Sequence, residues 1–138
     1  MTNMLNIRRL IFFTLSLAIL FSPAAVAGQE NLLDGKIFVG QSEEKHRRGV
    51  SEDELRFKNG EFHSIGYGQK GFSEGIYTAR AEADKIYFEA ETVSPKKGRI
   101  KWRGIVHKDS IEVNYRWSKK GWLSDTKRDY VFKGILKQ

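Results

Sequence analysis

Apolar and polar residues alternate along most of the chain, which is the pattern of strands that bury one face. The clearest example is a unit that occurs twice, at residues 77–92 and 102–117. Each copy begins with an aromatic residue, has a small residue two positions later, and has an Asp five positions further on, Asp84 in the first and Asp109 in the second. Asp is favoured where a tight turn reverses the chain. Each copy therefore predicts a β-hairpin.

The same alternation predicts an all-β fold of about eight strands. Asn59-Gly60 is a strong hairpin signal because both residues tolerate positive φ. No connection is long enough for a crossover helix, so we expect an antiparallel up-and-down meander. Closing the meander into a barrel removes its exposed edges. The expected strands are 36–40, 53–58, 61–67, 75–82, 85–92, 99–107, 110–118 and 128–137.

The two faces of these strands differ in polarity. One face is apolar and aromatic and the other is charged, so the charged face must meet water. This excludes an outer-membrane barrel, which turns an apolar face to lipid, and predicts a small soluble barrel. Small inward residues such as Ala90 and Gly104 allow either a cavity for an apolar ligand or a core filled by large aromatics, and we favour the filled core. The aromatic residues expected in the interior are Tyr77, Trp102, Tyr115, Trp117 and Phe132.

Residues 1–27 have the form of a secretory signal peptide. Arg8 and Arg9 precede an apolar run, and Ala25-Val26-Ala27 completes a cleavage site. We expect cleavage there, which leaves residues 28–138 as a single secreted or periplasmic domain without a membrane span. The alternative is a leader kept as an anchor, although its apolar run is short for a span of about 20 residues.

Charge separates between the two ends of the expected barrel. The connections at one end are tight turns, whereas those at the other end, at 41–52, 67–75, 93–98 and 118–127, are longer and frame a mouth. The formal charge of +7 includes two arginines in the leader, and the remaining +5 equals the excess of basic residues in these connections and Arg128. A basic rim concentrates anions, and barrel mouths are recurrent ligand sites; the alternative is that the loops are simply solvated. The candidate binding residues are Lys45, Arg47, Arg48, Lys70, Phe72, Lys96, Lys97, Lys119, Lys120 and Trp122.

Trp122 and Leu123 follow directly after two lysines and a glycine. An apolar tip beside basic residues can touch a membrane surface, such as the cell envelope, or an acidic partner. The other possibility is that Trp122 folds over the mouth as a plug, which is the interpretation we favour. Phe72 poses the same choice.

The expected architecture resembles that of the calycins, the superfamily of lipocalins, fatty-acid-binding proteins and avidins. Gly35-Lys36-Ile37-Phe38 lies where lipocalins carry Gly-x-Trp on the first strand, here without the Trp, and the lipocalin Thr-Asp-Tyr motif has no counterpart. The resemblance covers nearly all of the chain after the leader and implies a closed barrel. It carries over no individual binding residue, and a family of small exported bacterial barrels is the alternative.

Catalytic and metal chemistry have little support in the sequence. The absence of cysteine excludes a disulfide framework, a thiol nucleophile and a Cys zinc site. The three histidines, His46, His63 and His107, lack metal-ligand spacing. We therefore expect no enzyme, no metal and no cofactor, and export argues against nucleic acid as a partner.

Two functions remain as hypotheses. The first is a binding module that takes a small apolar or anionic ligand at the basic mouth. The second is a protein-interaction role, such as an exported inhibitor or envelope accessory protein, in which a filled barrel presents its loops to an acidic partner.

Overall fold

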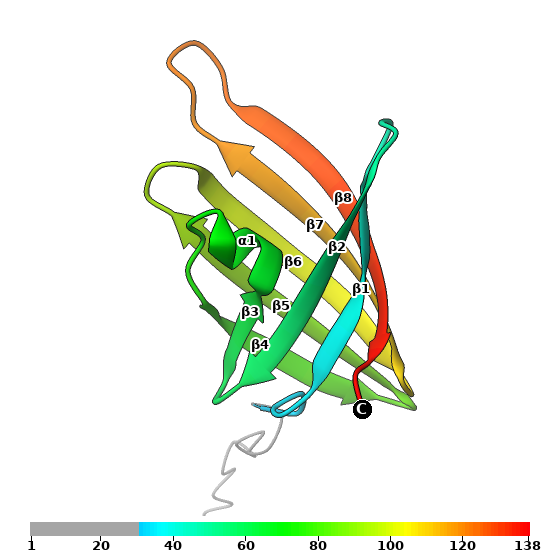
Figure 1. Cartoon of the computed structure of the whole chain (residues 1–138). Coiled ribbons are helices and arrows are strands. Elements are labelled where there is room, and N and C mark those ends of the chain that lie inside the picture. The colour runs from blue at the N-terminus through cyan, green and yellow to red at the C-terminus, as the bar shows by residue number, and fades with distance from the viewer. Residues whose placement is uncertain (1–30) are drawn as a thin grey trace, which may run out of the picture.

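The protein forms a closed barrel of eight antiparallel strands arranged in sequence order (Figure 1). The computed structural model describes residues 31–138, so the expected leader at 1–27 lies outside the described residues. Each strand pairs with the next one along the chain, and β8 pairs with β1 to close the barrel. This confirms the all-β meander. The elements are β1 (Ile37–Glu44), β2 (Val50–Lys58), β3 (Glu61–Ser64), α1 (Ile65–Gln69), β4 (Gly75–Glu82), β5 (Lys85–Ser94), β6 (Gly98–His107), β7 (Ser110–Lys119) and β8 (Thr126–Leu136).

β3 is shorter than expected because Ser64 begins a helix. The sequence predicted a strand over 61–67, which is wrong beyond Ser64. The Ser64 hydroxyl accepts a hydrogen bond from the backbone N–H of Tyr67 at 3.1 Å, and the Asp53 carboxylate on β2 accepts from the N–H of Gly66 at 2.8 Å. Side-chain acceptors of this kind satisfy the free amides of a first helical turn. The carboxylate of Asp53, on another strand, therefore favours a helix over a strand at residues 65–67.

Two hairpins extend further than the sequence indicated. β1 and β2 pair as far as Glu43 and Val50, which reduces the expected connection at 41–52 to the turn 45–49. β7 and β8 pair as far as Lys119 and Thr126, which leaves only 120–125 as a turn. Both hairpins project beyond the barrel as arms that point to different sides (Figure 1).

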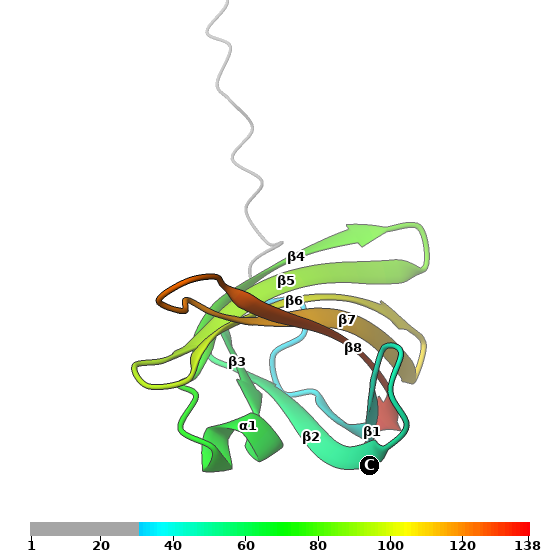
Figure 2. The same cartoon turned by 90° about the horizontal axis from the view of Figure 1, so that it is seen from above.

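The barrel closes through a short seam between β3 and β4. Only two residue pairs join these strands, Glu61 with Ile76 and Phe62 with Gly75. Beyond them the N–H of Tyr77 donates to the carbonyl of Gly60 at 3.1 Å. Within the described chain, the second half of β4 pairs with β5 alone and forms an edge of the sheet (Figure 2).

The turn at 31–35 closes the barrel at the end where the tight hairpins lie. Leu33 is fully buried in the core, and its N–H donates to the Tyr77 hydroxyl at 3.2 Å. That hydroxyl in turn donates to the Asp34 carboxylate at 2.7 Å. The first described residues thus seal one end of the interior.

Aromatic side chains fill the interior. Phe57 lies at the centre, with ring centroids 5.0 Å from those of Tyr77 and Phe88. Trp102 stacks on Tyr115 at 4.3 Å, and its indole N–H donates to the hydroxyl of Thr92 at 3.0 Å. The buried aromatic residues, each at most 5% exposed, are Phe38, Phe57, Phe62, Phe72, Tyr77, Phe88, Trp102, Tyr115 and Phe132.

Small inward residues make room for these rings. A Cβ added at Gly104 would overlap the ring of Phe88, and one added at Gly134 would come within 2.7 Å of the ring of Phe132. Trp117, the last of the aromatics that alternation placed inside, is only partly buried and packs at the edge of the core. The space left by small side chains is therefore occupied by large ones.

Candidate functional site

The barrel has two unlike ends. The base carries the tight turns at 59–60, 83–84 and 108–109, and the opposite end, here called the loop end, carries α1 and the turns at 45–49, 95–97 and 120–125 (Figure 1). All ten residues that the sequence singled out lie at the loop end. Phe72 is buried, and the exposed ones are Lys45, Arg47, Arg48, Lys70, Lys96, Lys97, Lys119, Lys120 and Trp122.

Six basic residues gather on one side of the loop end, where two hairpins lie next to each other. β6 and β7 pair as far as Arg99 and Ser118, so the 95–97 turn lies beside the end of β7. The approach is close, since a Cβ added at Gly98 would overlap the carbonyl oxygen of Ser118. On the far side of β7, Lys127 and Arg128 of β8 pair with Ser118 and Trp117. The resulting basic cluster consists of Lys96, Lys97, Lys119, Lys120, Lys127 and Arg128.

Trp117 holds this cluster together. Its indole N–H donates to the carbonyl of Lys97 at 2.7 Å, which ties the 95–97 turn to β7. The Arg128 guanidinium lies over its ring at 5.7 Å, within the range of a cation–π contact. A partly buried Trp on β7 therefore links the 95–97 turn with β7 and β8.

Lys45, Arg47 and Arg48 occupy a separate hairpin, the β1–β2 tip at residues 45–49. Arg47 pairs with Glu44 at 3.5 Å, and Glu44 also lies 3.9 Å from the Nε of Arg128. Beyond this contact the two arms diverge (Figure 2). Apart from Lys70, which lies at the end of α1, the basic residues thus form two groups bridged by one carboxylate, rather than the continuous rim that the sequence indicated.

The two apolar candidates at the loop end behave differently. Phe72 is 5% exposed and its ring lies 5.6 Å from that of Tyr67, so it covers the core. Trp122 is 95% exposed and Leu123 is 87% exposed. The expectation that Trp122 is a plug is therefore wrong. The physical reason is the continued pairing of β7 and β8, which carries the turn away from the barrel.

α1 closes the barrel at the loop end. Its Tyr67 ring lies 5.7 Å from both Trp102 and Tyr115, and the hydroxyls of Tyr67 and Tyr115 are 3.2 Å apart. Burial raises the pKa of both tyrosines above the ordinary value, so both hydroxyls stay neutral across the physiological range. The Lys70 ammonium lies over the Tyr67 ring at 4.8 Å. Tyr67 is thus a lid residue that alternation alone did not identify.

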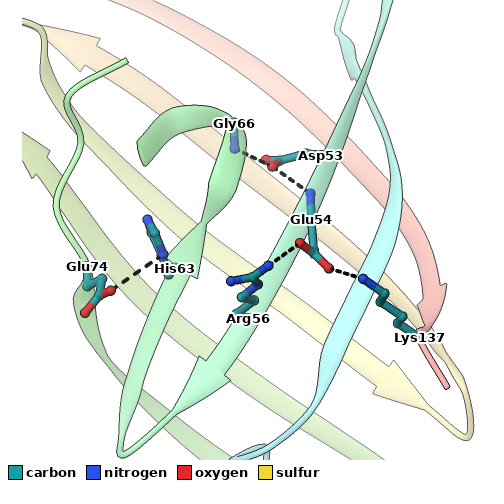
Figure 3. A network of polar contacts seen from close by, with 7 residues as sticks. All are labelled: Asp53, Glu54, Arg56, His63, Gly66, Glu74 and Lys137. Atoms are coloured by element: carbon teal, nitrogen blue, oxygen red, sulfur yellow. Dashed lines mark hydrogen bonds and ion pairs between the residues drawn. The ribbon is translucent and has the colours of Figure 1, made fainter. Parts of the chain in front are cut away.

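Polar contacts on the outer face connect β2 with Lys137, which follows β8, and β3 with the segment before β4 (Figure 3). Glu54 accepts from Arg56 at 2.8 Å and from Lys137 at 3.2 Å, and these hydrogen bonds hold its pKa below the usual range. His63 lies 3.6 Å from Glu74. These side chains connect segments of the outer surface with one another, which is a structural role. Within residues 31–138 no group of three or more His, Cys, Asp or Glu side chains is arranged to hold a metal ion.

The outer face also holds an open groove that sequence reasoning missed. It runs from α1 across β2, β1 and β8, with Val39, Val131 and Ile135 among its apolar residues. Alternation assigns these side chains outward but does not show that the sheet curls to bring them together. The charged residues that line it are mostly acidic: Glu43, Glu52, Asp53, Glu54, Glu112, Lys133 and Lys137. Acidic and basic surfaces therefore occupy different parts of the molecule.

No helix within residues 31–138 has the length and apolarity needed to cross a membrane. Comparison of the chain with models of known protein families, with curated proteins and with solved structures found no match.

Proposed function

We propose that this protein is a binding protein without catalytic activity, whose loop end attaches to an acidic partner while the barrel serves as a rigid scaffold. The observation that carries the proposal is the combination of a filled interior with an exposed basic cluster. Loops held on a rigid sheet are a common place for binding residues. The calycin-like architecture agrees with such a role, because barrels of this kind present loops at one end.

The packed interior favours this function over a small ligand inside the barrel. The Phe88 ring occupies the space beside Gly104, and Tyr67 and Phe72 cover the loop end. An apolar ligand would have to displace these side chains and forfeit their contacts with one another. Binding on the outside of the loop end needs no such rearrangement.

Electrostatics support an acidic partner. The six side chains of the basic cluster are exposed, and Asp125 is the only acidic residue in the turns 95–97 and 120–125. Exposed charges attract an oppositely charged surface and steer its approach. Their effect is screened over about 10 Å at 0.1 M salt. Binding should therefore weaken as salt rises. The secretory leader expected at 1–27 supports a partner at the cell envelope or outside the cell.

The test compares two variants that reverse the same amount of charge at opposite ends. Lys119→Glu with Lys120→Glu alters the basic cluster, and Lys58→Glu with Lys85→Glu alters exposed positions near the base. We expect immobilised wild-type protein and the base variant to retain the same component of envelope extract at low salt and to release it at high salt. The cluster variant should retain little of it. Retention that is unaffected by salt and by the cluster variant would contradict the proposal.

A further inference from the structure

We infer that the acidic partner is an anionic lipid bilayer, and that the β7–β8 tip, residues 119–128, inserts Trp122 and Leu123 into its interface. This inference rests on the proposed function, because it names the partner of the same loop end. Two consecutive large apolar side chains that are 95% and 87% exposed are costly to leave in water. They gain a favourable environment where water meets lipid.

The tip has the shape of an anchor rather than of a docking groove. β7 and β8 remain paired up to Lys119 and Thr126, so a two-stranded arm carries the turn away from the barrel (Figure 1). The turn itself is tight, since a Cβ added at Gly121 would overlap the carbonyl oxygen of Ser124. A convex tip fits a protein only where that protein offers a matching cavity. A bilayer accepts it without shape complementarity.

Basic residues flank the apolar pair on both strands. Lys119 and Lys120 precede it, and Lys127 and Arg128 follow it, with Asp125 as the one acidic residue between them. Trp is favoured at the interface between lipid and water, and neighbouring Lys and Arg bind anionic headgroups. Lys96 and Lys97, which lie beside β7, extend the same basic surface. The apolar pair is thus placed to enter the lipid–water interface, and the cations are placed to bind the anionic headgroups beside it.

The exposed apolar residues Ile76 and Ile135 lack this arrangement. Ile76 is 77% exposed and Ile135 is 63% exposed, but each lies on a strand face. Ile135 faces the groove whose charged residues are mostly acidic, which repels anionic lipid. Single exposed apolar residues are ordinary on protein surfaces. Ile135 therefore provides a matched control for the apolar tip.

The tryptophans report insertion directly. Trp102 is 2% exposed, Trp117 is partly buried and Trp122 is 95% exposed, so Trp122 is the tryptophan with the most contact with water. With vesicles of equal parts phosphatidylglycerol and phosphatidylcholine, we expect the emission to shift to the blue. We also expect quenching by brominated acyl chains. Vesicles of phosphatidylcholine alone should give little change, because the headgroup charge is missing.

Co-sedimentation with the same vesicles measures the contribution of each part. Trp122→Ser with Leu123→Ser should weaken binding by roughly ten- to a hundredfold, and Lys119→Glu with Lys120→Glu should also weaken it. Ile135→Ser, and Lys58→Glu with Lys85→Glu, should bind as the wild type does. Circular dichroism checks that every variant is folded, and because the tip contacts little of the barrel, the tip variants should keep the wild-type spectrum.

Three outcomes would overturn the inference. The first is no binding to phosphatidylglycerol vesicles by wild-type protein that still captures an acidic protein in a salt-dependent way; the proposed function would then survive. The second is vesicle binding that the Trp122 and Leu123 variant leaves unchanged. The third is lipid-independent self-association that this variant abolishes, which would make a second copy the occupant of the tip. Failure of both vesicle binding and salt-dependent capture would instead remove the proposed function.

Discussion

Gly104 has no side chain, and the packing of the core depends on that. The ring of Phe88 occupies the volume that a Cβ would take, and both residues lie in the filled interior on neighbouring strands. A close-packed core has no spare volume for an added methyl group, because neighbouring rings must shift off their preferred rotamers. The size of a single residue here therefore bears on the stability of the whole barrel.

We predict that Gly104→Ala lowers the free energy of unfolding by about 1–3 kcal/mol, measured by urea denaturation. Arg103→Ala, on the exposed face next to it, should change that free energy by less than about 0.5 kcal/mol. Adding Phe88→Leu to Gly104→Ala should recover part of the loss, because it vacates the contested space. A Gly104→Ala variant as stable as the wild type would show that the interior is not full.

The buried tyrosines predict a loss of stability at alkaline pH. Burial raises the pKa of Tyr67, Tyr77 and Tyr115 in the folded protein. Above about pH 10, the ordinary tyrosine value, the unfolded chain loses these protons while the folded chain retains them. The contribution of these tyrosines to the free energy of unfolding is therefore fully present below that pH. It decreases as the pH rises above it.

Urea denaturation near neutral pH and at about pH 11 measures this fall. Tyr67→Phe with Tyr115→Phe removes two of the three hydroxyls, which face each other at 3.2 Å, and should make the fall shallower. Removing both partners together leaves neither hydroxyl of this pair without the other. An equally steep fall in this double variant would contradict the assignment.

At the scale of elements, the position of α1 depends on Asp53. Its carboxylate accepts hydrogen bonds from the Ser64 hydroxyl at 2.5 Å and from the N–H of Gly66 at 2.8 Å. A helix of five residues has few internal hydrogen bonds to hold it. The link to β2 therefore keeps Tyr67 over the end of the barrel.

We predict that Asp53→Ala lowers the free energy of unfolding by about 1–3 kcal/mol. Glu52→Ala, at the exposed neighbouring position, should change it by less than about 0.5 kcal/mol. In the wild type the N–H of Tyr67 donates to the Ser64 hydroxyl. In the Asp53→Ala variant we expect this N–H to exchange faster with solvent. Unchanged exchange at this amide in the Asp53 variant would show that α1 is held by other contacts.

Alternation predicted the strands well where each strand has one wet and one dry face. The repeated hairpins at 77–92 and 102–117 follow this rule, and they form β4 with β5 and β6 with β7. It failed at 65–67, because Asp53 is distant in sequence and the pattern cannot show that its carboxylate meets Gly66. It also failed at 119–128, where residues of both faces are exposed, so pairing alone decides how far the arm extends.

The sequence predicted that basic residues gather at one end of the barrel, but it did not predict how they are arranged there. A meander fixes which connections share an end, so the position of the lysines and arginines followed from topology. Whether those connections meet depends on the divergence of the β1–β2 and β7–β8 hairpins (Figure 2). The acidic outer groove escaped prediction for the same reason, because the curl of the sheet is a property of all the strands together.

At the scale of the whole molecule, the filled barrel separates stability from binding. The aromatic core and the turn at 31–35 hold the fold, while the basic cluster and the β7–β8 tip contribute little to the core. Surface variants at the tip should therefore change binding without unfolding the protein. Core variants such as Gly104→Ala should have the opposite effect.

The most direct test of this separation is amide chemical-shift mapping on the isotope-labelled protein during titration with laurate, which is both apolar and anionic. We predict that the shifts stay at the loop end, in residues 96–97 and 119–128, and that the amide signals of Phe88, Trp102 and Tyr115 do not move. Saturable shifts at those three core amides would contradict the account, because they would show that the interior opens to take a ligand.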